Sequence, residues 1–132
     1  MIHVERGTED EYGELIALDG RHALITRAIK NRQLILARKH GQTAGFLIFN
    51  QSFFEQFFIE LIIVKADARQ QGVGSALVRY FEKTHPDSKI FTSTNQSNLP
   101  AQAFFESLGF VKSGWIENLD ADDPEIIYFK AT

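Results

Sequence analysis

The spacing of hydrophobic residues changes along the chain, and these changes predict an alternation of strands and helices. Continuous or alternating apolar runs predict strands, whereas apolar residues three and four positions apart predict helices. Residues 2–6 form the first predicted strand. Thr8 and Glu11 have the spacing of a capping box, which starts a helix, and a weaker helical pattern follows over residues 21–32.

The middle of the chain predicts a hairpin followed by a central strand. Residues 34–38 and 44–49 are apolar runs on either side of a short polar turn, which is typical of a β-hairpin. Residues 57–64 are apolar on both faces, as expected for a strand that is covered on both sides. Glu60 is the only charged residue in this strand.

The second half of the chain predicts two helices, each followed by strands. A helical pattern starts at Val73, and a strand covers residues 90–94. Pro100 begins the next helix and Gly109 ends it, before strands at 110–115 and 125–130. The predicted order is β-αα-β-β-β-α-β-α-β-β, a mixed α/β fold with helices on both faces of one sheet. The helical spacing predicts burial of Val73, Ala76, Leu77, Tyr80 and Phe81 in the first helix, and of Ala101, Phe104, Phe105 and Leu108 in the second.

Composition limits the classes of protein that are compatible with this pattern. A chain of 132 residues predicts a single domain over residues 1–132. The absence of cysteine excludes disulfides, thiolate metal sites and a cysteine nucleophile. The net charge is -3, whereas nucleic-acid-binding domains are usually basic. No signal peptide or membrane-spanning segment is evident. We therefore expect a cytoplasmic protein with no nucleic-acid or membrane partner. The histidines lack metal-ligand spacing, so we expect no metal site; they are His3, His22, His40 and His85.

Residues 64–75 carry the strongest chemical pattern in the sequence. They follow the predicted central strand and open a helix. Gly72 and Gly74 remove side chains at this turn, so backbone N–H groups and the helix dipole can converge on an anion such as a phosphate. The absence of a Gly-Lys-Ser/Thr sequence excludes a Walker A loop, and Leu77 stands where a dinucleotide fingerprint has its third glycine. On this local pattern alone, a purely structural glycine turn remains an alternative.

Two segments of the chain resemble motifs of the GNAT N-acetyltransferase superfamily. Residues 69–74, Arg-Gln-Gln-Gly-Val-Gly, are similar to the family motif R/Q-x-x-G-x-G/A and follow an apolar strand, as they do in the family. Residues 98–110, which start with Asn98-x-x-Ala and end with Phe-Phe-Glu-Ser-Leu-Gly-Phe, resemble the family's N-x-x-A…F-Y-E-x-L-G-F helix. The resemblance covers about residues 44–117. It implies a small single-domain member with a mixed, mostly antiparallel central sheet.

The resemblance also implies a site for acetyl-CoA. The backbone of Ile62 and Val64 would pair with the pantetheine arm like an added strand, and Asn98 would reach the pantetheine amides. The acceptor would approach from the opposite side, and a homodimer is a further family-based expectation. The residues implied to surround the pyrophosphate are Arg69, Gln70, Gln71, Gly72, Val73, Gly74 and Ser75, and Phe105 is implied to lie at the cofactor.

Acetyl transfer to an amine needs a base, because an alkylammonium with a pKa of about 10.4 is almost entirely protonated at pH 7. Glu60 is the candidate: it stands alone on an apolar strand, where desolvation disfavours the charged form, and it matches a strand glutamate that serves as base in many GNAT enzymes. A solvated or ion-paired carboxylate is the alternative. The N–H of Val64 would polarise the thioester carbonyl. Phe105 replaces the tyrosine that is the family's usual general acid; we expect catalysis to survive, slower by up to about 10²-fold. Tyr80 and Tyr128 could substitute, although both positions are typical of packing.

The sequence therefore predicts an N-acetyltransferase that moves an acetyl group from acetyl-CoA to a primary amine. An acidic loop favours a small cationic acceptor, although such loops are more often simply solvated, and a protein N-terminus or lysine stays open. A catalytically weak acyl-CoA-binding sensor is the alternative that Phe105 favours, and a general nucleotide-phosphate binder is a weaker one. Phe53 and Phe54 are expected in the core, in an acceptor pocket or at an oligomer contact. The acidic loop contains Asp120, Asp122, Asp123 and Glu125.

Overall fold

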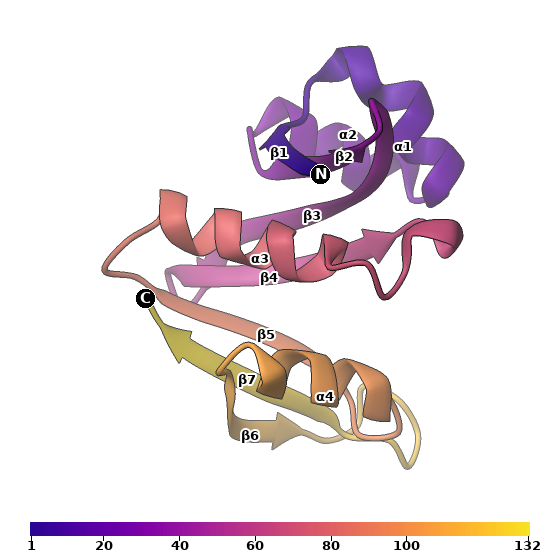
Figure 1. Cartoon of the computed structure of the whole chain (residues 1–132). Helices are drawn as coiled ribbons and strands as arrows, with labels where there is room; N and C mark the ends of the chain where they lie inside the picture. The colour runs from indigo at the N-terminus through magenta and orange to yellow at the C-terminus, as the bar shows by residue number, and fades with distance from the viewer. The chain divides into compact units, whose positions relative to one another are not determined.

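The computed structural model describes residues 1–132 and contains a mixed seven-stranded sheet with four α-helices. The strand order is β1-β2-β3-β4-β5-β7-β6, in which β4 and β5 pair in parallel and the β1–β2, β2–β3, β5–β7 and β6–β7 pairs are antiparallel. The predicted order of strands and helices is confirmed (Figure 1). The elements are β1 (Ile2–Arg6), η1 (Glu9–Glu11), α1 (Tyr12–Leu18), α2 (His22–Lys30), β2 (Leu34–Lys39), β3 (Gln42–Phe53), β4 (Gln56–Val64), η2 (Ala66–Ala68), α3 (Val73–Thr84), β5 (Lys89–Asn95), α4 (Leu99–Ser107), β6 (Val111–Ile116) and β7 (Glu125–Ala131).

The chain divides into two compact units. The first contains residues 1–50 and 60–86, and the second contains residues 51–59 and 87–132. None of the helices combines the length and the apolar character that are needed to cross a bilayer.

The first unit has its helices on opposite faces of its strands. α1 and α2 pack on one face, where their apolar residues join every second residue of β2 and β3. On the other face, the ring of Phe49 in β3 lies 4.6 Å from the ring of Phe81 in α3. The cluster beneath α1 and α2 contains Leu15, Ile25, Ala28, Leu34, Leu36, Phe46 and Ile48.

The N-terminal ends of the helices follow the predicted capping chemistry. The Thr8 side chain accepts the N–H of Asp10, and the Glu11 carboxylate accepts the N–H of Thr8 at 2.8 Å, which completes the capping box.

The buried face of α3 differs in part from the predicted one. Val78 is buried, whereas Ala76 and Tyr80, which were predicted to be buried, are half-buried.

Gly45 allows β3, β4 and α3 to approach one another closely. A Cβ atom at this position would lie 2.5 Å from the carbonyl oxygen of Ile63 and 3.1 Å from a methyl group of Val73. The absence of a side chain at Gly45 therefore sets the position of the last residues of β4.

In the second unit, α4 packs through an aromatic cluster and one buried amide. The ring of Phe105 lies 5.6 Å from that of Phe110 and 5.8 Å from that of Tyr128. Gln102 is also buried, and its Nε2 donates to the carbonyl oxygens of Asn95 and Gln96 at 3.3 and 2.6 Å. The prediction of a fully buried apolar stripe was wrong at three positions, because Ala101, Phe104 and Leu108 are only half-buried. The Gln102 amide is buried instead, since it donates to the carbonyls at the end of β5.

The predicted end of β3 was also wrong. The strand continues to Phe53 and joins β4 through a two-residue turn, Phe54–Glu55, with φ angles of 51° and 65°. Tight hairpin turns of this hand usually contain Asn or Gly, and neither residue occurs at this turn. In β4 we expected both faces to be covered, but Ile59 alone is fully buried and the other residues are half-buried. The ladder between β4 and β5 covers Phe57 to Ile59.

Candidate functional site

The turn before α3 has the geometry of an anion site. Gly72 adopts the left-handed conformation, with φ 84° and ψ 9°, and its carbonyl accepts the first helical hydrogen bond, from the N–H of Ala76 at 2.9 Å. The N–H groups of Val73, Gly74 and Ser75 therefore come before the first N–H that donates within the helix, that of Ala76. They lie at the positive end of the helix dipole, as the sequence predicts.

The side chains beside this turn are positively charged or neutral. The Nε of Arg69 donates to the carbonyl of Val64 at 3.4 Å. The amide of Gln71 donates to the carbonyl of Asp67 at 2.9 Å and accepts from the ammonium of Lys39. Gln71 thus holds the turn together, and Lys39 adds a positive charge that the sequence pattern did not predict.

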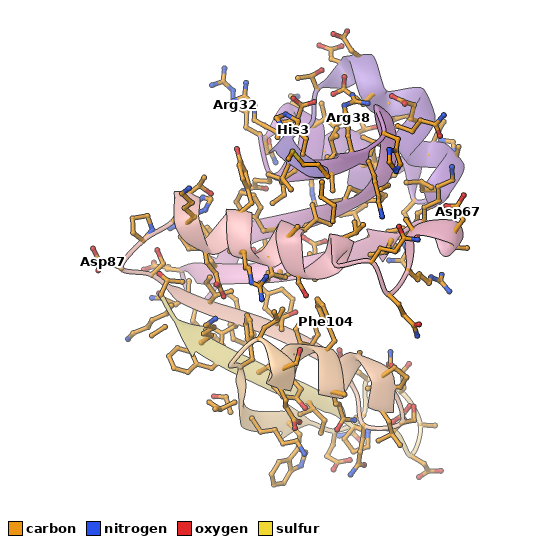
Figure 2. The ribbon with its side chains drawn as sticks, in the orientation of Figure 1. His3, Arg32, Arg38, Asp67, Asp87 and Phe104 are labelled. Carbon is orange, nitrogen blue, oxygen red and sulfur yellow. The ribbon has the colours of Figure 1, made fainter.

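Asp67 is the acidic residue nearest in sequence to this turn. Its carboxylate lies 3.9 Å from the ammonium of Lys65, and the side chain is exposed in Figure 2. Residues 69–75 contain no carboxylate, so the turn suits a negatively charged ligand.

After Ile59, successive residues of β4 direct their backbone N–H and C=O groups to opposite edges of the strand. The N–H of Lys65 donates to the carbonyl of Ala44 in β3 at 2.8 Å. Because successive residues of an antiparallel strand direct their N–H and C=O groups to opposite sides, Ile62 and Val64 direct these groups away from β3. These are the two residues that the family resemblance implies would pair with a ligand.

Glu60 is not the isolated carboxylate that we expected. One nitrogen of the Arg27 guanidinium donates to both carboxylate oxygens, at 2.9 and 2.8 Å, and the amide of Asn50 donates at 2.8 Å. The Glu60 side chain is 25% exposed and that of Arg27 is 53% exposed. These three hydrogen bonds fix the position of the carboxylate.

Sequence reasoning missed both partners of Glu60. Arg27 lies 33 positions earlier in the sequence, in α2, and no local pattern connects the two residues. Asn50 lies just beyond the predicted strand at 44–49, whereas in the structure it continues β3. The available signal for this contact was the polar Asn50 directly after the apolar run 44–49. An antiparallel hairpin brings such a residue close to Glu60, the charged residue of the next strand.

The remaining predicted site residues belong to the second unit. The Oδ1 of Asn98 accepts the N–H of Ala101 at 3.1 Å and caps α4, which leaves the amide nitrogen of Asn98 outside the cap. Phe105 is 7% exposed and packs in the aromatic cluster of α4.

The two candidate tyrosines have packing roles. Tyr128 is fully buried, and its hydroxyl donates to the Glu106 carboxylate at 2.7 Å. Burial, together with this negatively charged acceptor, raises the pKa of Tyr128 to about 12, which opposes proton donation near neutral pH. Tyr80 is half-buried in α3.

The acidic loop between β6 and β7 is attached to the end of β5. Asp120 accepts from the amide of Asn95 at 2.8 Å, and Asp123 accepts from the hydroxyl and the N–H of Ser97 at 2.6 and 3.0 Å. Glu125 accepts from the hydroxyl of Ser93. Neutral hydrogen-bond donors therefore hold these acidic side chains in place.

The aromatic residues of the β3–β4 turn differ in exposure. Phe53 is half-buried, and its ring lies about 5 Å from those of Phe58 and Phe91 in an aromatic cluster of the second unit. Phe54 is 85% exposed at the tip of the turn.

The sequence model of the Acetyltransferase (GNAT) family matches residues 5–110, and the chain belongs to this family. The chain is similar to the peptidyl-lysine N-acetyltransferase YiaC of Escherichia coli K12, with 29% identity over 82 residues. That match covers 62% of this chain and 52% of the relative, so it spans about half the length of YiaC. The peptidyl-lysine N-acetyltransferase YjaB of Salmonella typhimurium is 23% identical, over 94% of this chain and 93% of its own length.

Solved structures agree with this assignment. A GNAT-family acetyltransferase from Bacillus cereus ATCC 10987 superposes with a TM-score of 0.92 at 32% identity, over 100% of this chain and 98% of that chain. A structure described as a streptothricin acetyltransferase from Bacillus anthracis, in complex with acetyl coenzyme A, has a TM-score of 0.64 at 26% identity. It covers 75% of this chain and 61% of that chain.

Proposed function

We propose that the protein is an N-acetyltransferase that uses acetyl-CoA to acetylate a primary amine. The observation that carries this proposal is the family match over residues 5–110, which includes the left-handed Gly72 turn at the start of α3. The similar Bacillus anthracis protein, solved with acetyl coenzyme A, supports acetyl-CoA as the acetyl donor.

The donors on the chain suit the chemistry of this co-substrate. The free N–H groups of Val73 to Ser75, with Arg69 beside them, fit the negative charges of a pyrophosphate. The outward-facing backbone groups of Ile62 and Val64 fit the amides of an extended pantetheine arm, which can pair with a strand edge. The free amide nitrogen of Asn98 can donate to a pantetheine carbonyl.

In the proposed reaction, acetyl-CoA supplies a thioester, and the residues of the chain move a proton and stabilise charge. The amine nitrogen forms a bond to the acetyl carbon, the carbon–sulfur bond breaks, and Glu60 accepts the proton that the amine loses. The N–H of Val64 donates to the oxygen on which negative charge develops. Because a thiol has a pKa of about 8.5, expelling CoA as the thiolate at pH 7 costs only about 2 kcal/mol. Solvent can therefore supply the proton that Phe105 cannot.

The proposed acceptor group is a primary alkylammonium. YiaC and YjaB are named as peptidyl-lysine N-acetyltransferases, which favours a lysine side chain. The negatively charged β6–β7 loop attracts cations of either kind, so a small polyamine-like molecule is the second candidate.

The experiment that separates an enzyme from a binding-only sensor is the substitution Glu60→Gln. For an enzyme with Glu60 as base, we expect kcat to fall by about 10²-fold or more, with the acetyl-CoA Kd unchanged within about twofold. Glu55→Gln is the matched control, because Glu55 is an exposed carboxylate in the adjacent turn. A Glu60→Gln variant as active as Glu55→Gln would show that Glu60 is not the base. A wild-type protein that binds acetyl-CoA without turnover would support the sensor.

A further inference from the structure

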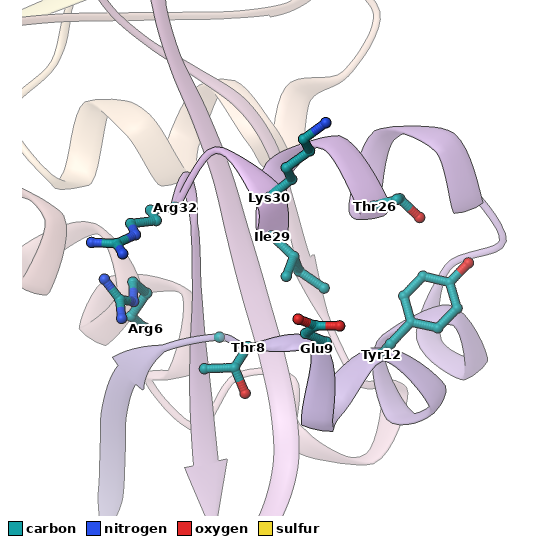
Figure 3. A pocket seen from close by; sticks show the side chains of 9 residues that line it. Arg6, Thr8, Glu9, Tyr12, Thr26, Ile29, Lys30 and Arg32 are labelled. Carbon is teal, nitrogen blue, oxygen red and sulfur yellow. The ribbon is translucent and has the colours of Figure 1, made fainter.

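The first unit contains a cavity of about 720 Å³ that is separate from Glu60. Its walls come from the end of β1, the turn that follows, the start of α1 and the C-terminal half of α2 (Figure 3). Ile29 lines the cavity from α2. Thr26 and Lys30 line it from the same helix, whereas Arg27 and Glu60 are not among the lining residues.

The walls of this cavity carry an excess of positive charge. Arg6, Lys30 and Arg32 line it together with a single carboxylate, that of Glu9. None of the three cations forms an ion pair. Arg38 of the same unit shows the contrast, because acidic side chains surround it and the hydrogen bond from Arg38 lowers the pKa of Glu5. In a chain with more acidic than basic residues, a cavity with three unpaired cations is suited to an anion.

The positions of the side chains define the type of anion. In Figure 3 the guanidinium groups of Arg6 and Arg32 lie at the same end of the cavity, and Ile29 points into its middle. Arg32 reaches this position from a left-handed backbone conformation, with φ 59°, two residues after the end of α2. Two guanidinium groups provide parallel N–H donors that match a carboxylate or a phosphate. Ile29 provides an apolar surface for the body of a ligand.

We propose that this cavity binds a small metabolite whose carboxylate or phosphate group is held by Arg6 and Arg32. Its apolar part lies against Ile29. Glu9 repels a second negative charge in the middle of the cavity, and it favours a hydroxyl or amino group on the ligand there. A cavity of this volume is within the range of small-molecule sites. The proposal is independent of the acetyltransferase reaction, because none of these residues belongs to the site proposed for it.

The test is calorimetric titration with glycerol 3-phosphate, succinate and inorganic phosphate, and with glycerol as the uncharged probe. Each titration is run with the free protein and again with saturating CoA, which would fill the anion site at α3. We expect one saturable site for at least one anion in both conditions, and no binding of glycerol. Preference for glycerol 3-phosphate or succinate distinguishes a phosphate ligand from a carboxylate ligand.

The variants Arg6→Gln and Arg32→Gln assign the binding to the cavity. Each should weaken binding by about tenfold or more, because a charge-assisted hydrogen bond is lost. Arg79→Gln is the matched control, since Arg79 is an exposed arginine in α3 and should leave the affinity unchanged. Equal affinity in all three variants, or no saturable binding of any anion in the millimolar range, would overturn the proposal. Binding that disappears only when CoA is present would instead assign the anion to the turn before α3.

Discussion

Glu60 combines an apolar strand with two polar partners, and this combination decides what the residue can do. Arg27 and Asn50 donate three hydrogen bonds to its carboxylate. These bonds fix the direction of its oxygens. A base needs a defined position relative to the amine. Arg27 is therefore a positioning residue in the proposed mechanism.

Arg27→Gln tests this positioning role. The Arg27 side chain is half-exposed, and exposed ion pairs contribute at most about 1 kcal/mol to stability, so the melting temperature should change little. The proposed kcat should fall by about tenfold, because the carboxylate loses its fixed orientation. Steady-state kinetics and thermal unfolding of the same preparations measure the two effects. Loss of stability with unchanged kcat would indicate a purely structural pair.

Tyr128 should make the fold less stable as the pH rises above about 10. Its pKa of about 12 in the folded chain exceeds the value of about 10 in an unfolded chain, so the protonated hydroxyl stabilises the fold fully below pH 10. This contribution, about 2.7 kcal/mol for two pKa units, is lost as the pH rises through about 12. Urea unfolding at pH 8, 10 and 11 should show a steeper loss of stability in the wild type than in Tyr128→Phe. Equal slopes would contradict the assigned pKa.

At the scale of the elements, the sequence predicted most of the fold because its signals are local. The capping box at Thr8, Pro100 at the start of α4 and the left-handed Gly109 at its end all act within one helical turn. The Phe54–Glu55 turn was missed because its left-handed residues are not the usual Asn or Gly. The contact between α2 and Glu60 could not be predicted, since it depends on where a helix lies across a sheet.

The close approach of β3 to β4 at Gly45 supports the proposed ligand-binding edge of β4. In Gly45→Ala, the new Cβ would contact the carbonyl of Ile63, and the backbone of Ile63 and Val64 must shift. We expect a loss of about 1–3 kcal/mol in the free energy of unfolding and weaker binding of acetyl-CoA. Chemical denaturation and calorimetry measure the two changes.

Gly13→Ala provides the matched control for this substitution. A Cβ at Gly13 in α1 would meet no atom within 4 Å, and alanine favours a helix by up to about 1 kcal/mol. This variant should therefore be as stable as the wild type or more so, with unchanged acetyl-CoA affinity. If Gly45→Ala behaved in the same way, the close contact at β4 would have no energetic importance.

At the scale of the whole molecule, selective binding of a CoA ligand should appear as a gain in stability. A ligand at 100 times its Kd stabilises a folded protein by about 2.7 kcal/mol, which corresponds to roughly 10 °C in melting temperature for a chain of this size. We expect such a shift with CoA or acetyl-CoA and a much smaller one with ATP at the same concentration. Equal shifts with ATP would indicate a general phosphate site.

Release of free thiol from acetyl-CoA measures directly whether the protein transfers an acetyl group to an amine. The purified protein is mixed with acetyl-CoA and with a panel of lysine-containing peptides and small polyamines, and acetylated products are identified by mass spectrometry. We expect amine-dependent thiol release together with one acetyl group on a primary amine, and loss of both in Glu60→Gln. Selective acetyl-CoA binding without thiol release from any amine would contradict it.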